Sequence, residues 1–181
     1  MQKLNLGCGN KKLDGFLNID INPNFEPDKV VDLEKGKLPF KDNSIDYVVA
    51  NYVLEYIGDG FCNLIKEIYR VCESGATVEI MVTHPRHDDF IDDFNHKRAI
   101  SLTLLKTLGK KFCSWYKDFY SGKNGLGDEL NVDFEFIAQD YLWDEMYTDL
   151  VKNNKLQDLM EISKRFNNVI KAIKVKMVVL K

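Results

Sequence analysis

The sequence lacks any apolar run long enough to cross a membrane. A transmembrane helix needs about 20 consecutive apolar residues, and no stretch of this 181-residue chain approaches that length. The chain also opens without the basic and then apolar segments of a secretory signal peptide, because Met1 leads almost directly into a predicted strand. We therefore expect no membrane partner.

Paired cysteines are absent as well. Cys8, Cys62, Cys72 and Cys113 form no CxxC motif and show no spacing typical of zinc sites. Cys62 and Cys72 lie in an apolar helical pattern, which predicts buried thiols. A reducing, cytoplasmic location is the expectation.

Positive charge is not in excess, since 25 Lys and Arg against 28 Asp and Glu give a net charge of −3. This balance argues against nucleic acid as the partner, because phosphate binding needs a basic surface. Residues 128–149 contain eight acids and no Lys or Arg, whereas residues 152–181 are basic. Two solvated faces explain the asymmetry, and a basic tail that docks on an acidic partner is the alternative. The length predicts one domain, residues 1–181.

Short apolar runs alternate with helical or loop segments along the chain. Seven of these runs predict strands, at residues 3–7, 16–21, 29–33, 45–51, 77–84, 131–137 and 173–181. An amphipathic helix between the fourth and fifth strands is predicted to be capped by Asp59 and ended by Gly75. Ser101 is predicted to cap a later helix. The pattern predicts an α/β fold, a Rossmann-like, mostly parallel seven-stranded sheet with an antiparallel edge.

The stretch LNLGCGN places Gly7 and Gly9 at the carboxyl end of the first strand, where open α/β sheets bind ligands. Glycine there lets the backbone approach a ligand and adopt positive φ. Asp20 ends the second strand, thirteen residues after Gly7, and its carboxylate offers only acceptors to the hydroxyls of a ribose. Asp32, at the end of the third strand, is placed to receive an adenine amino group.

A nicotinamide-dinucleotide fold also uses glycines at this position, but its motif needs a third glycine and an acid about 20 residues further on. Lys12 occupies the third position, and the segment before Asp20 is too short for a full helix that could hold a pyrophosphate. The pattern favours a nucleoside ligand without phosphates over an NAD-dependent oxidoreductase. A tight turn at the strand end is the purely structural explanation of GCG.

With these motifs, the sequence resembles the class I S-adenosylmethionine-dependent methyltransferases, in their small type 11 branch. The stretches LNLGCG, GFLNIDI, VVDLEKGKLPFKDNSIDYVVANYVLEYI and ESGATVEIMV follow the family's order over roughly the first half of the chain. The resemblance implies a methyltransferase sandwich, S-adenosylmethionine as the cofactor and S-adenosylhomocysteine as the product. The cofactor-binding residues that it implies are Gly7, Cys8, Gly9, Asp20, Ile21, Asp32, Leu33, Asn51 and Tyr52.

The same resemblance implies roles within this set. Residues 7–9 would line the methionine part of the cofactor, and Asp20 would hold the ribose. Residues 32–33 would flank the adenine, and residues 51–52 would close over the sulfonium.

Two features depart from the family pattern. Tyr56 stands in LEYI, where the family often has histidine in LEHI, and the helix after the first strand is shortened to a loop. One subset of the family has a later stretch similar to DPTHKRFFS, which DFNHKRAIS (93–101) resembles. This looser resemblance suggests a glycan-type acceptor, which stands beside a small molecule as the predicted acceptor class.

All three histidines lie in residues 83–101, THPRHDDFIDDFNHKRAIS. An acceptor hydroxyl or ammonium must lose a proton, and histidine is the usual base near neutral pH. His84 ends the fifth strand and His96 lies on a loop that can fold over the same edge, so both are candidate catalytic residues, with Arg98 as a candidate anion clamp. His84 can instead satisfy backbone groups at the strand end, and residues 96–98 can instead cap the next helix or pin the loop. His87 is predicted to face solvent.

Histidines and carboxylates in one loop also raise the hypothesis of a metal site. Their spacing matches no established motif such as HExxH, so a polar substrate-binding loop is preferred and no metal ligand is predicted. The aromatic stretch FCSWYKDFY (112–120) could close over the acceptor pocket, with Tyr116 as a substrate-binding residue. A helix that is half core and half surface is the alternative.

The predicted function is methyl transfer from S-adenosylmethionine to a small-molecule or glycan-type acceptor. Residues 1–84 would form the cofactor-binding half and residues 85–181 the substrate side. The alternative function is a non-catalytic S-adenosylmethionine-binding module that acts as a regulator or subunit.

Overall fold

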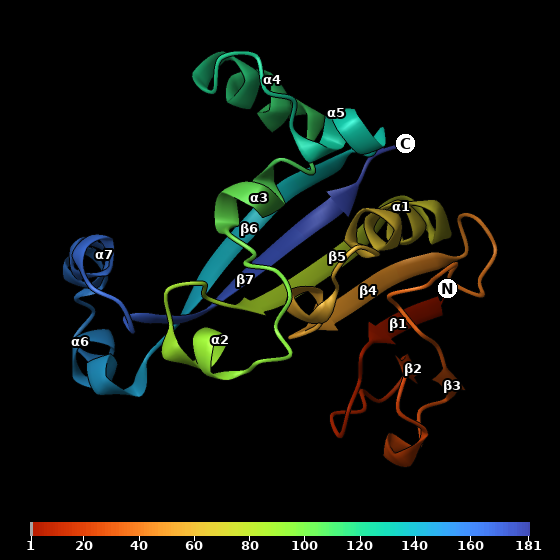
Figure 1. Ribbon diagram of the computed structural model, residues 1–181, viewed down its shortest axis with the longest axis horizontal. Coiled ribbons are helices and arrows are strands. Elements are labelled where there is room, and N and C mark those ends of the chain that lie inside the picture. The colour runs from red at the N-terminus through yellow and green to blue at the C-terminus, as the bar shows by residue number, and fades with distance from the viewer. Residues whose placement is uncertain (1) are drawn as a thin grey trace.

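The computed structural model describes residues 2–181, which contain one seven-stranded sheet in the order β3-β2-β1-β4-β5-β7-β6 (Figure 1). The strands are β1 (Gln2–Leu6), β2 (Leu17–Asp20), β3 (Lys29–Val30), β4 (Ile45–Asn51), β5 (Cys72–Thr83), β6 (Phe134–Trp143) and β7 (Ile170–Val179). The first five strands pair in parallel, and β7 lies antiparallel to both β5 and β6. The predicted Rossmann-like sheet with its antiparallel edge is confirmed.

Short helices fill the connections between the strands. The α-helices are α1 (Phe61–Val71), α2 (Asp88–Asp92), α3 (Leu102–Lys106), α4 (Lys110–Phe119), α5 (Leu126–Leu130), α6 (Thr148–Lys152) and α7 (Leu156–Arg165). Three single-turn 3₁₀ helices are η1 (Pro23–Phe25), η2 (Leu54–Tyr56) and η3 (Glu145–Tyr147). Within residues 2–181, no helix combines the length and apolar character needed to span a membrane.

One face of the central strands carries the core. Val78, Ile80 and Val82 alternate along β5 and are at most 1% exposed, and α1 packs over them (Figure 1). Leu64 and Ile68, one turn apart on α1, are buried in the same cluster. Burial of each such side chain contributes about 1.5–3 kcal/mol, so the spacing of apolar residues in α1 fixes which side of the helix meets the sheet.

The residues that alternate with this core form a polar layer on the other face. The hydroxyl of Tyr47 on β4 donates to Glu79 on β5, and the amines of Lys174 and Lys176 on β7 lie 3.4 and 3.3 Å from the same carboxylate. Burial, together with the bond to Glu79, raises the pKa of Tyr47 to about 12, so its hydroxyl keeps its proton. Polar and charged side chains on the second face of the sheet therefore form hydrogen bonds and ion pairs with one another.

The connection from β1 to β2 is a short loop, as the sequence predicts, and the buried side chain of Asn18 supports it. The Oδ1 atom of Asn18 accepts from the backbone N–H of Leu13 at 2.8 Å and from the side-chain amide of Asn5 at 2.9 Å. The backbone N–H of Asn18 donates to the carboxylate of Asp28 at 2.7 Å. These bonds fix the ends of β1 and β2 relative to each other.

The predicted cap of α1 is wrong. The helix begins at Phe61 without a side-chain cap, so Asp59 does not serve as one. The carboxylate of Glu34, from the loop after β3, instead accepts from the backbone N–H groups of Gly58 and Gly60 at 2.8 and 2.9 Å. Glu34, which is distant in sequence, therefore accepts hydrogen bonds just before the helix in place of a local cap.

The predicted end of α1 is also wrong. The helix ends at Val71, because β5 begins directly at Cys72, and Gly75 lies inside that strand. Cys72 is buried as expected, but Cys62 is exposed, since it lies on the solvent side of the helix.

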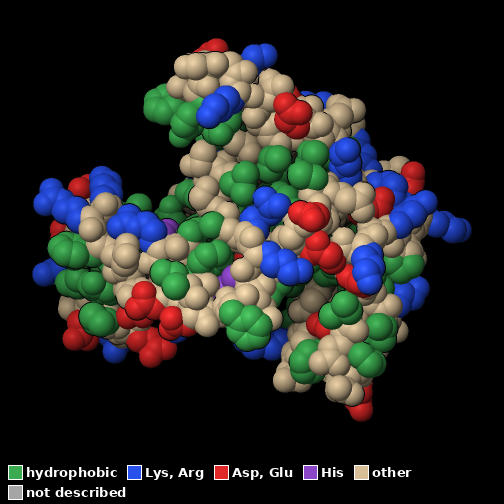
Figure 2. All heavy atoms as spheres, in the orientation of Figure 1, with side chains coloured by type: hydrophobic (Ala, Val, Ile, Leu, Met, Phe, Trp, Pro, Cys, Tyr) green, Lys and Arg blue, Asp and Glu red, His purple; other side chains and the backbone are tan. Residues whose placement is uncertain are grey.

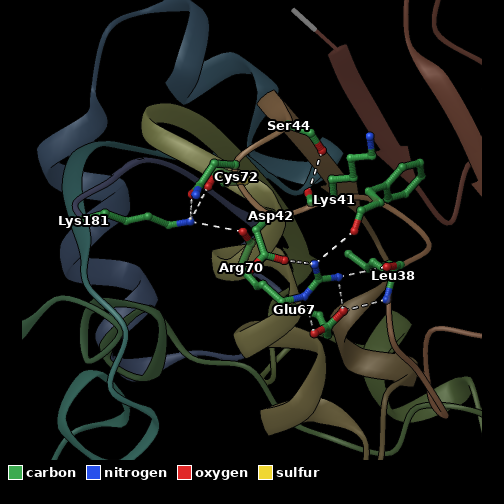
Figure 3. A network of polar contacts seen from close by, with 10 residues as sticks. Leu38, Lys41, Asp42, Ser44, Glu67, Arg70, Cys72 and Lys181 are labelled. Carbon is green, nitrogen blue, oxygen red and sulfur yellow. Dashed lines mark hydrogen bonds and ion pairs between the residues drawn. The ribbon is translucent and has the colours of Figure 1, made fainter.

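The loop before β4 is fastened to the end of α1 by Arg70 (Figure 3). The guanidinium of Arg70 donates to the carbonyl oxygens of Leu38 and Phe40 at 3.0 Å each and pairs with the carboxylates of Asp42 and Glu67. Glu67 also accepts from the backbone N–H of Leu38 at 2.8 Å. The hydrogen bonds from Arg70 lower the pKa of Glu67.

We expect Glu67→Gln to lower the free energy of unfolding at pH 7 by roughly 2 kcal/mol, because hydrogen bonds to charged groups contribute about 1.5–3 kcal/mol. The folded pKa of Glu67 lies below its usual value. The stability from its carboxylate is therefore present above that usual value and is lost as the pH falls through the folded pKa. Urea unfolding at neutral and acidic pH measures the difference, which should shrink in acid. The exposed variant Glu161→Gln is the control, and a difference for Glu67→Gln that does not change with pH would contradict this account.

Candidate functional site

The carboxyl ends of β1, β2 and β4 meet at one edge of the sheet around a cavity of about 400 Å³. Its polar lining includes Asp20, Asp32, Glu34 and Lys97, and Val31, Leu33 and Ile57 are among its apolar walls. A smaller cavity of about 140 Å³ adjoins it at Gly7 and Tyr52. The predicted cofactor residues that line one or both cavities are Gly7, Cys8, Asp20, Ile21, Asp32, Leu33, Asn51 and Tyr52. The remaining one, Gly9, is hydrogen-bonded to Asp20.

Two residues at strand ends have left-handed backbone conformations that shape these cavities. Gly7 has φ +60°, and a Cβ atom there would lie 2.6 Å from Cγ2 of Val53. Tyr52 has φ +56° directly after β4, and its backbone N–H donates to the carbonyl of Met81 at 2.7 Å. A non-glycine residue in this region costs about 1–3 kcal/mol and persists only where its surroundings enforce it.

Asp20 is held by the backbone and still has free acceptor sites. Its Oδ2 accepts from the N–H of Gly9 at 2.9 Å, and its Oδ1 accepts from the N–H of Asn22 at 2.8 Å. The side chain is only 8% exposed. Each oxygen of a carboxylate can accept a second hydrogen bond, so this group is fixed in position and can bind two neighbouring hydroxyls.

Lys97 brings the later part of the chain into the first cavity. Its amine lies 3.5 Å from the carboxylate of Glu34. The hydrogen bonds from Gly60 and then from Gly58 lower the pKa of Glu34, so this carboxylate stays charged. Sequence reasoning missed both residues, because their contact depends on a loop that returns to the sheet 63 residues further along the chain (97 − 34).

A third cavity of about 250 Å³ adjoins the first through Tyr52 and Tyr56, which line both. Its other lining residues are polar, namely Thr83, Asp89, Asp93, His96 and Lys171. The amine of Lys171 on β7 lies 3.6 Å from Asp89. Two tyrosine rings therefore separate a partly apolar cavity from a polar one.

His96 points one nitrogen at a fixed partner and leaves the other free. Its Nδ1 lies 2.8 Å from the carbonyl oxygen of Phe90, so Nδ1 carries the proton and donates it. Its ring stacks on Phe90 at a centroid distance of 4.9 Å and packs on Tyr56 at 4.6 Å. The side chain is 5% exposed. Its Nε2 has no hydrogen-bond partner within residues 2–181, and in the neutral ring it carries a lone pair.

Asp93 stands beside this free nitrogen. One of its oxygens lies 3.9 Å from Nε2 of His96 and accepts from the hydroxyl of Tyr56 at 2.7 Å. The bond from Tyr56 lowers the pKa of Asp93, which therefore remains ionised. Burial and the bond to Asp93 raise the pKa of Tyr56 to about 12, so the hydroxyl remains a donor.

Glu55 is fully buried behind this cavity. Its Oε1 accepts from the backbone N–H and the hydroxyl of Thr83 at 2.9 and 3.0 Å. Its carbonyl oxygen accepts from the N–H groups of Lys97 and Arg98 at 2.8 and 3.1 Å. Glu55 thus ties the end of β5 and the loop that carries His96 to the turn after β4.

The other two histidines lie outside the cavities. The Nδ1 of His84 accepts from the backbone N–H of Arg86 at 3.2 Å. Burial, followed by the charge of Arg86, lowers the pKa of His84, so its ring is neutral near pH 7. The prediction that His87 faces solvent is wrong. His87 is 4% exposed and caps α2, and its Nε2 lies 3.1 Å from Asp144 because residues 84–93 fold against the end of β6.

Arg98 and Tyr116 do not reach the third cavity. The guanidinium of Arg98 lies over the ring of Phe61 at 4.8 Å and donates to the carbonyl of Gly58 at 3.0 Å. Tyr116 on α4 packs against Tyr120, the residue that follows this helix, and α4 adjoins the start of β6 at the opposite end of the sheet. The structure therefore separates these two candidates from His96, and α4 forms no lid over the cavity.

No group of three or more His, Cys, Asp or Glu side chains in the part of the chain that the structure describes is arranged to hold a metal ion. The carboxylates of Asp88, Asp89 and Asp93 are instead engaged by the side chains of Asn168, Lys171 and Tyr56, respectively.

The comparisons with known proteins agree with this geometry. Residues 4–80 match the family model described as a methyltransferase domain. No curated protein sequence matches the chain significantly.

Solved structures share the fold. A S-adenosylmethionine-dependent methyltransferase from Archaeoglobus fulgidus aligns with a TM-score of 0.61 at 15% identity, over 98% of this chain and 85% of that one. Phosphoethanolamine N-methyltransferase 2 from Haemonchus contortus, solved with S-adenosylmethionine, gives 0.62 at 14% identity, over 100% of this chain and 49% of that one. A methyltransferase solved in complex with the Haloferax volcanii activator Trm112 gives 0.56 at 14% identity, over 99% and 83%.

We expect Gly7→Ala to weaken S-adenosylhomocysteine binding and to destabilise the fold by roughly 2–3 kcal/mol, because it adds a clash with Val53 to the cost of a left-handed alanine. Gly15→Ala is the matched control, since Gly15 has φ +77° and a Cβ added there would meet no atom within 4 Å. Gly15→Ala should lose only the stability that a left-handed alanine costs, and its affinity for S-adenosylhomocysteine should not change. Urea unfolding and titration calorimetry measure both effects, and equal losses in the two variants would contradict the role given to Gly7.

Proposed function

We propose that this chain, a class I S-adenosylmethionine-dependent methyltransferase of the type 11 branch, methylates a small polar acceptor bound beside His96. The family follows from its methyltransferase domain, and its fold agrees with that class. The observation that carries this proposal is the free Nε2 of His96, in a polar cavity that adjoins the cofactor-side cavity at Tyr52 and Tyr56.

The cavity at the ends of β1, β2 and β4 fits the cofactor. Asp20 has free acceptor sites for the two ribose hydroxyls. The apolar walls at Val31, Leu33 and Ile57 suit an adenine ring, with Asp32 beside them to accept from its amino group. The smaller cavity at Gly7, Cys8 and Asn51 suits the methionine end. These assignments make the nine residues of the sequence prediction the proposed cofactor site.

When bound, S-adenosylmethionine supplies a methyl group that its sulfonium already activates. The task of the chain is then to align the acceptor with that methyl group, to exclude water and to remove a proton. Tyr52 and Tyr56 lie between the two cavities and would border the path of transfer. In such a transfer the methyl carbon would bond to the acceptor atom while its bond to sulfur breaks, and the product would be S-adenosylhomocysteine.

We assign proton removal to His96. Its Nδ1–H is held by the carbonyl of Phe90, so its Nε2 can take the proton of an acceptor hydroxyl or ammonium. The ionised carboxylate of Asp93, 3.9 Å away, would stabilise the resulting imidazolium. His84 is the less suitable base, because it does not line the cavity and its Nδ1 is already engaged by Arg86.

The acceptor cavity offers polar partners on several sides. Asp89, Lys171 and the hydroxyl of Thr83 line it together with Asp93 and the tyrosines. Donors and acceptors in this mixture support a small molecule or a glycan-type acceptor with several hydroxyl or amino groups.

We propose that residues 1–84 form the cofactor-binding half and residues 85–181 the substrate side. Lys97 is the exception, because it follows residue 84 and lines the cofactor cavity. All four cysteines are free thiols, which supports a reducing cytoplasm as the proposed location.

The test compares His96→Gln with His84→Gln, using S-adenosylmethionine labelled in its methyl group and a pool of cellular small molecules as acceptors. We expect His96→Gln to lower the rate of labelled product formation by about 10²–10⁴-fold, the usual contribution of a general base. Its affinity for S-adenosylhomocysteine, measured by calorimetry, should not change. His84→Gln should keep most of the activity.

Full activity of His96→Gln would contradict this assignment. If the wild type binds the cofactor but labels no acceptor, the alternative of a non-catalytic S-adenosylmethionine-binding module is favoured.

A further inference from the structure

A basic and aromatic lobe stands apart from the proposed active site. Residues 106–123 contain five lysines and a single acid, Asp118. The helix α4 at the centre of this segment projects beyond the end of the sheet (Figure 1). It is anchored there by the backbone N–H of Lys110, which donates to Asp133 at 2.9 Å just before β6 begins. Nothing in the proposed methyl transfer uses this lobe.

Aromatic side chains on α4 and at its C-terminal cap form a connected exposed surface. Trp115 packs on Phe112 and stacks on Phe119 at centroid distances of 5.0 and 5.1 Å, and Phe119 packs edge-on against Tyr120 at 4.9 Å. Trp115 is 50% exposed, Phe119 65% and Tyr120 40%. Figure 2 shows hydrophobic side chains beside lysines on this lobe. An exposed apolar patch of this kind marks a surface that contacts another molecule or a membrane.

The lysines around these rings have no acidic partner. Within residues 2–181, none of Lys106, Lys110, Lys111, Lys117 and Lys123 forms an ion pair with a carboxylate. Lys97, Lys171 and Lys174 elsewhere are paired with carboxylates, whereas Lys152 and Lys155 on another exposed surface have no such partner within residues 2–181 either. The lobe therefore presents unpaired lysines together with exposed aromatic rings, and these suit an anionic partner that also has apolar parts.

The patch continues into a hollow of about 420 Å³ between α4 and β6. Phe112, Trp115 and Phe136 form its apolar walls, and Lys106 and Lys111 border it. Amines beside an apolar hollow match a lipid, in which an anionic headgroup is joined to acyl chains. They match a polynucleotide less well, because it has no acyl chains to occupy the apolar walls, and because a long chain of phosphates needs a continuous basic surface, which Asp133 and Glu135 interrupt.

We propose that α4 docks this protein on the surface of an anionic lipid bilayer. Trp115, Phe119 and Tyr120 would enter the boundary between headgroups and acyl chains, where aromatic side chains are favoured. The surrounding lysines would contact the anionic headgroups. This contact needs no spanning helix, so it replaces the expectation of no membrane partner, which concerned long apolar runs. The proposed active site, at the opposite edge of the sheet, would remain open.

Sedimentation with vesicles tests the proposal on the full chain. We expect the wild type to pellet with vesicles of phosphatidylcholine and about 30% phosphatidylglycerol, and to remain in solution with phosphatidylcholine alone. Lys111→Gln, Lys117→Gln and Lys123→Gln combined should weaken binding roughly 100-fold, at about fivefold for each lysine. Trp115→Ala with Phe119→Ala should weaken it at least about tenfold. Salt at about 0.5 M should release the wild type, because it screens the headgroup charge.

A matched control removes similar residues from another exposed surface, with Lys152→Gln, Lys155→Gln and Phe166→Ala combined. This variant should bind as the wild type does. In a Trp143→Phe background, the emission of Trp115 should shift to the blue on addition of the anionic vesicles, which tests insertion without altering the patch. Thermal unfolding verifies that each variant is folded.

A wild type that stays in solution with both kinds of vesicle would overturn the proposal. So would vesicle binding by the triple lysine variant at wild-type strength. Binding of a single-stranded RNA 20-mer without binding to vesicles would assign the patch to nucleic acid instead.

Discussion

The buried carboxylate of Glu55 joins the three segments that make the proposed acceptor pocket. Through its side chain and its carbonyl, it binds Thr83 at the end of β5 and the backbone at Lys97 and Arg98. Its Oε2 has no hydrogen-bond partner within residues 2–181, and an incompletely satisfied buried carboxylate is destabilising. The fold tolerates this cost at the point where the loop that carries His96 must be held against the sheet. The position of His96 therefore depends on a residue that does not line the cavity.

The proposed cofactor and acceptor sites share residues instead of lying in separate parts of the chain. Tyr52 and Tyr56 line both cavities, and Lys97 reaches the cofactor side from the residue next to His96. The left-handed backbone of Tyr52 is part of this arrangement, because it turns the chain sharply out of β4. A side-chain movement of Tyr52 or Tyr56 in one cavity should therefore also change the shape of the other.

The fold and much of the cofactor cavity could be predicted from the sequence because they rest on local patterns. Short apolar runs predict the seven strands, and the positions of Gly7 and Asp20 at strand ends follow from that assignment alone. The contacts of Glu34 with Gly58, and of His87 with Asp144, could not be predicted. Each contact joins residues that are far apart in the sequence. From the sequence alone, polar side chains such as Glu34 and His87 are expected to face solvent.

The same limit explains the candidates at Arg98 and Tyr116. The guanidinium of Arg98 could bind an anion, but it already lies over the ring of Phe61 in α1 and donates to the carbonyl of Gly58. Aromatic residues 112–120 follow the histidine loop in sequence, yet the chain crosses from one edge of the sheet to the other between them. Proximity in sequence was a poor guide here, because the crossover between the parallel strands β5 and β6 starts at the carboxyl end of one strand and finishes at the amino end of the other.

Calorimetric titration with S-adenosylhomocysteine tests the central claim most directly, on the wild type, on Asp20→Asn and on the exposed control Asp14→Asn. The account predicts micromolar binding by the wild type and by Asp14→Asn, and binding weakened by about 10–100-fold in Asp20→Asn through the lost hydrogen bonds to the ribose. Absence of binding by the wild type, or equal affinity in Asp20→Asn, would contradict it.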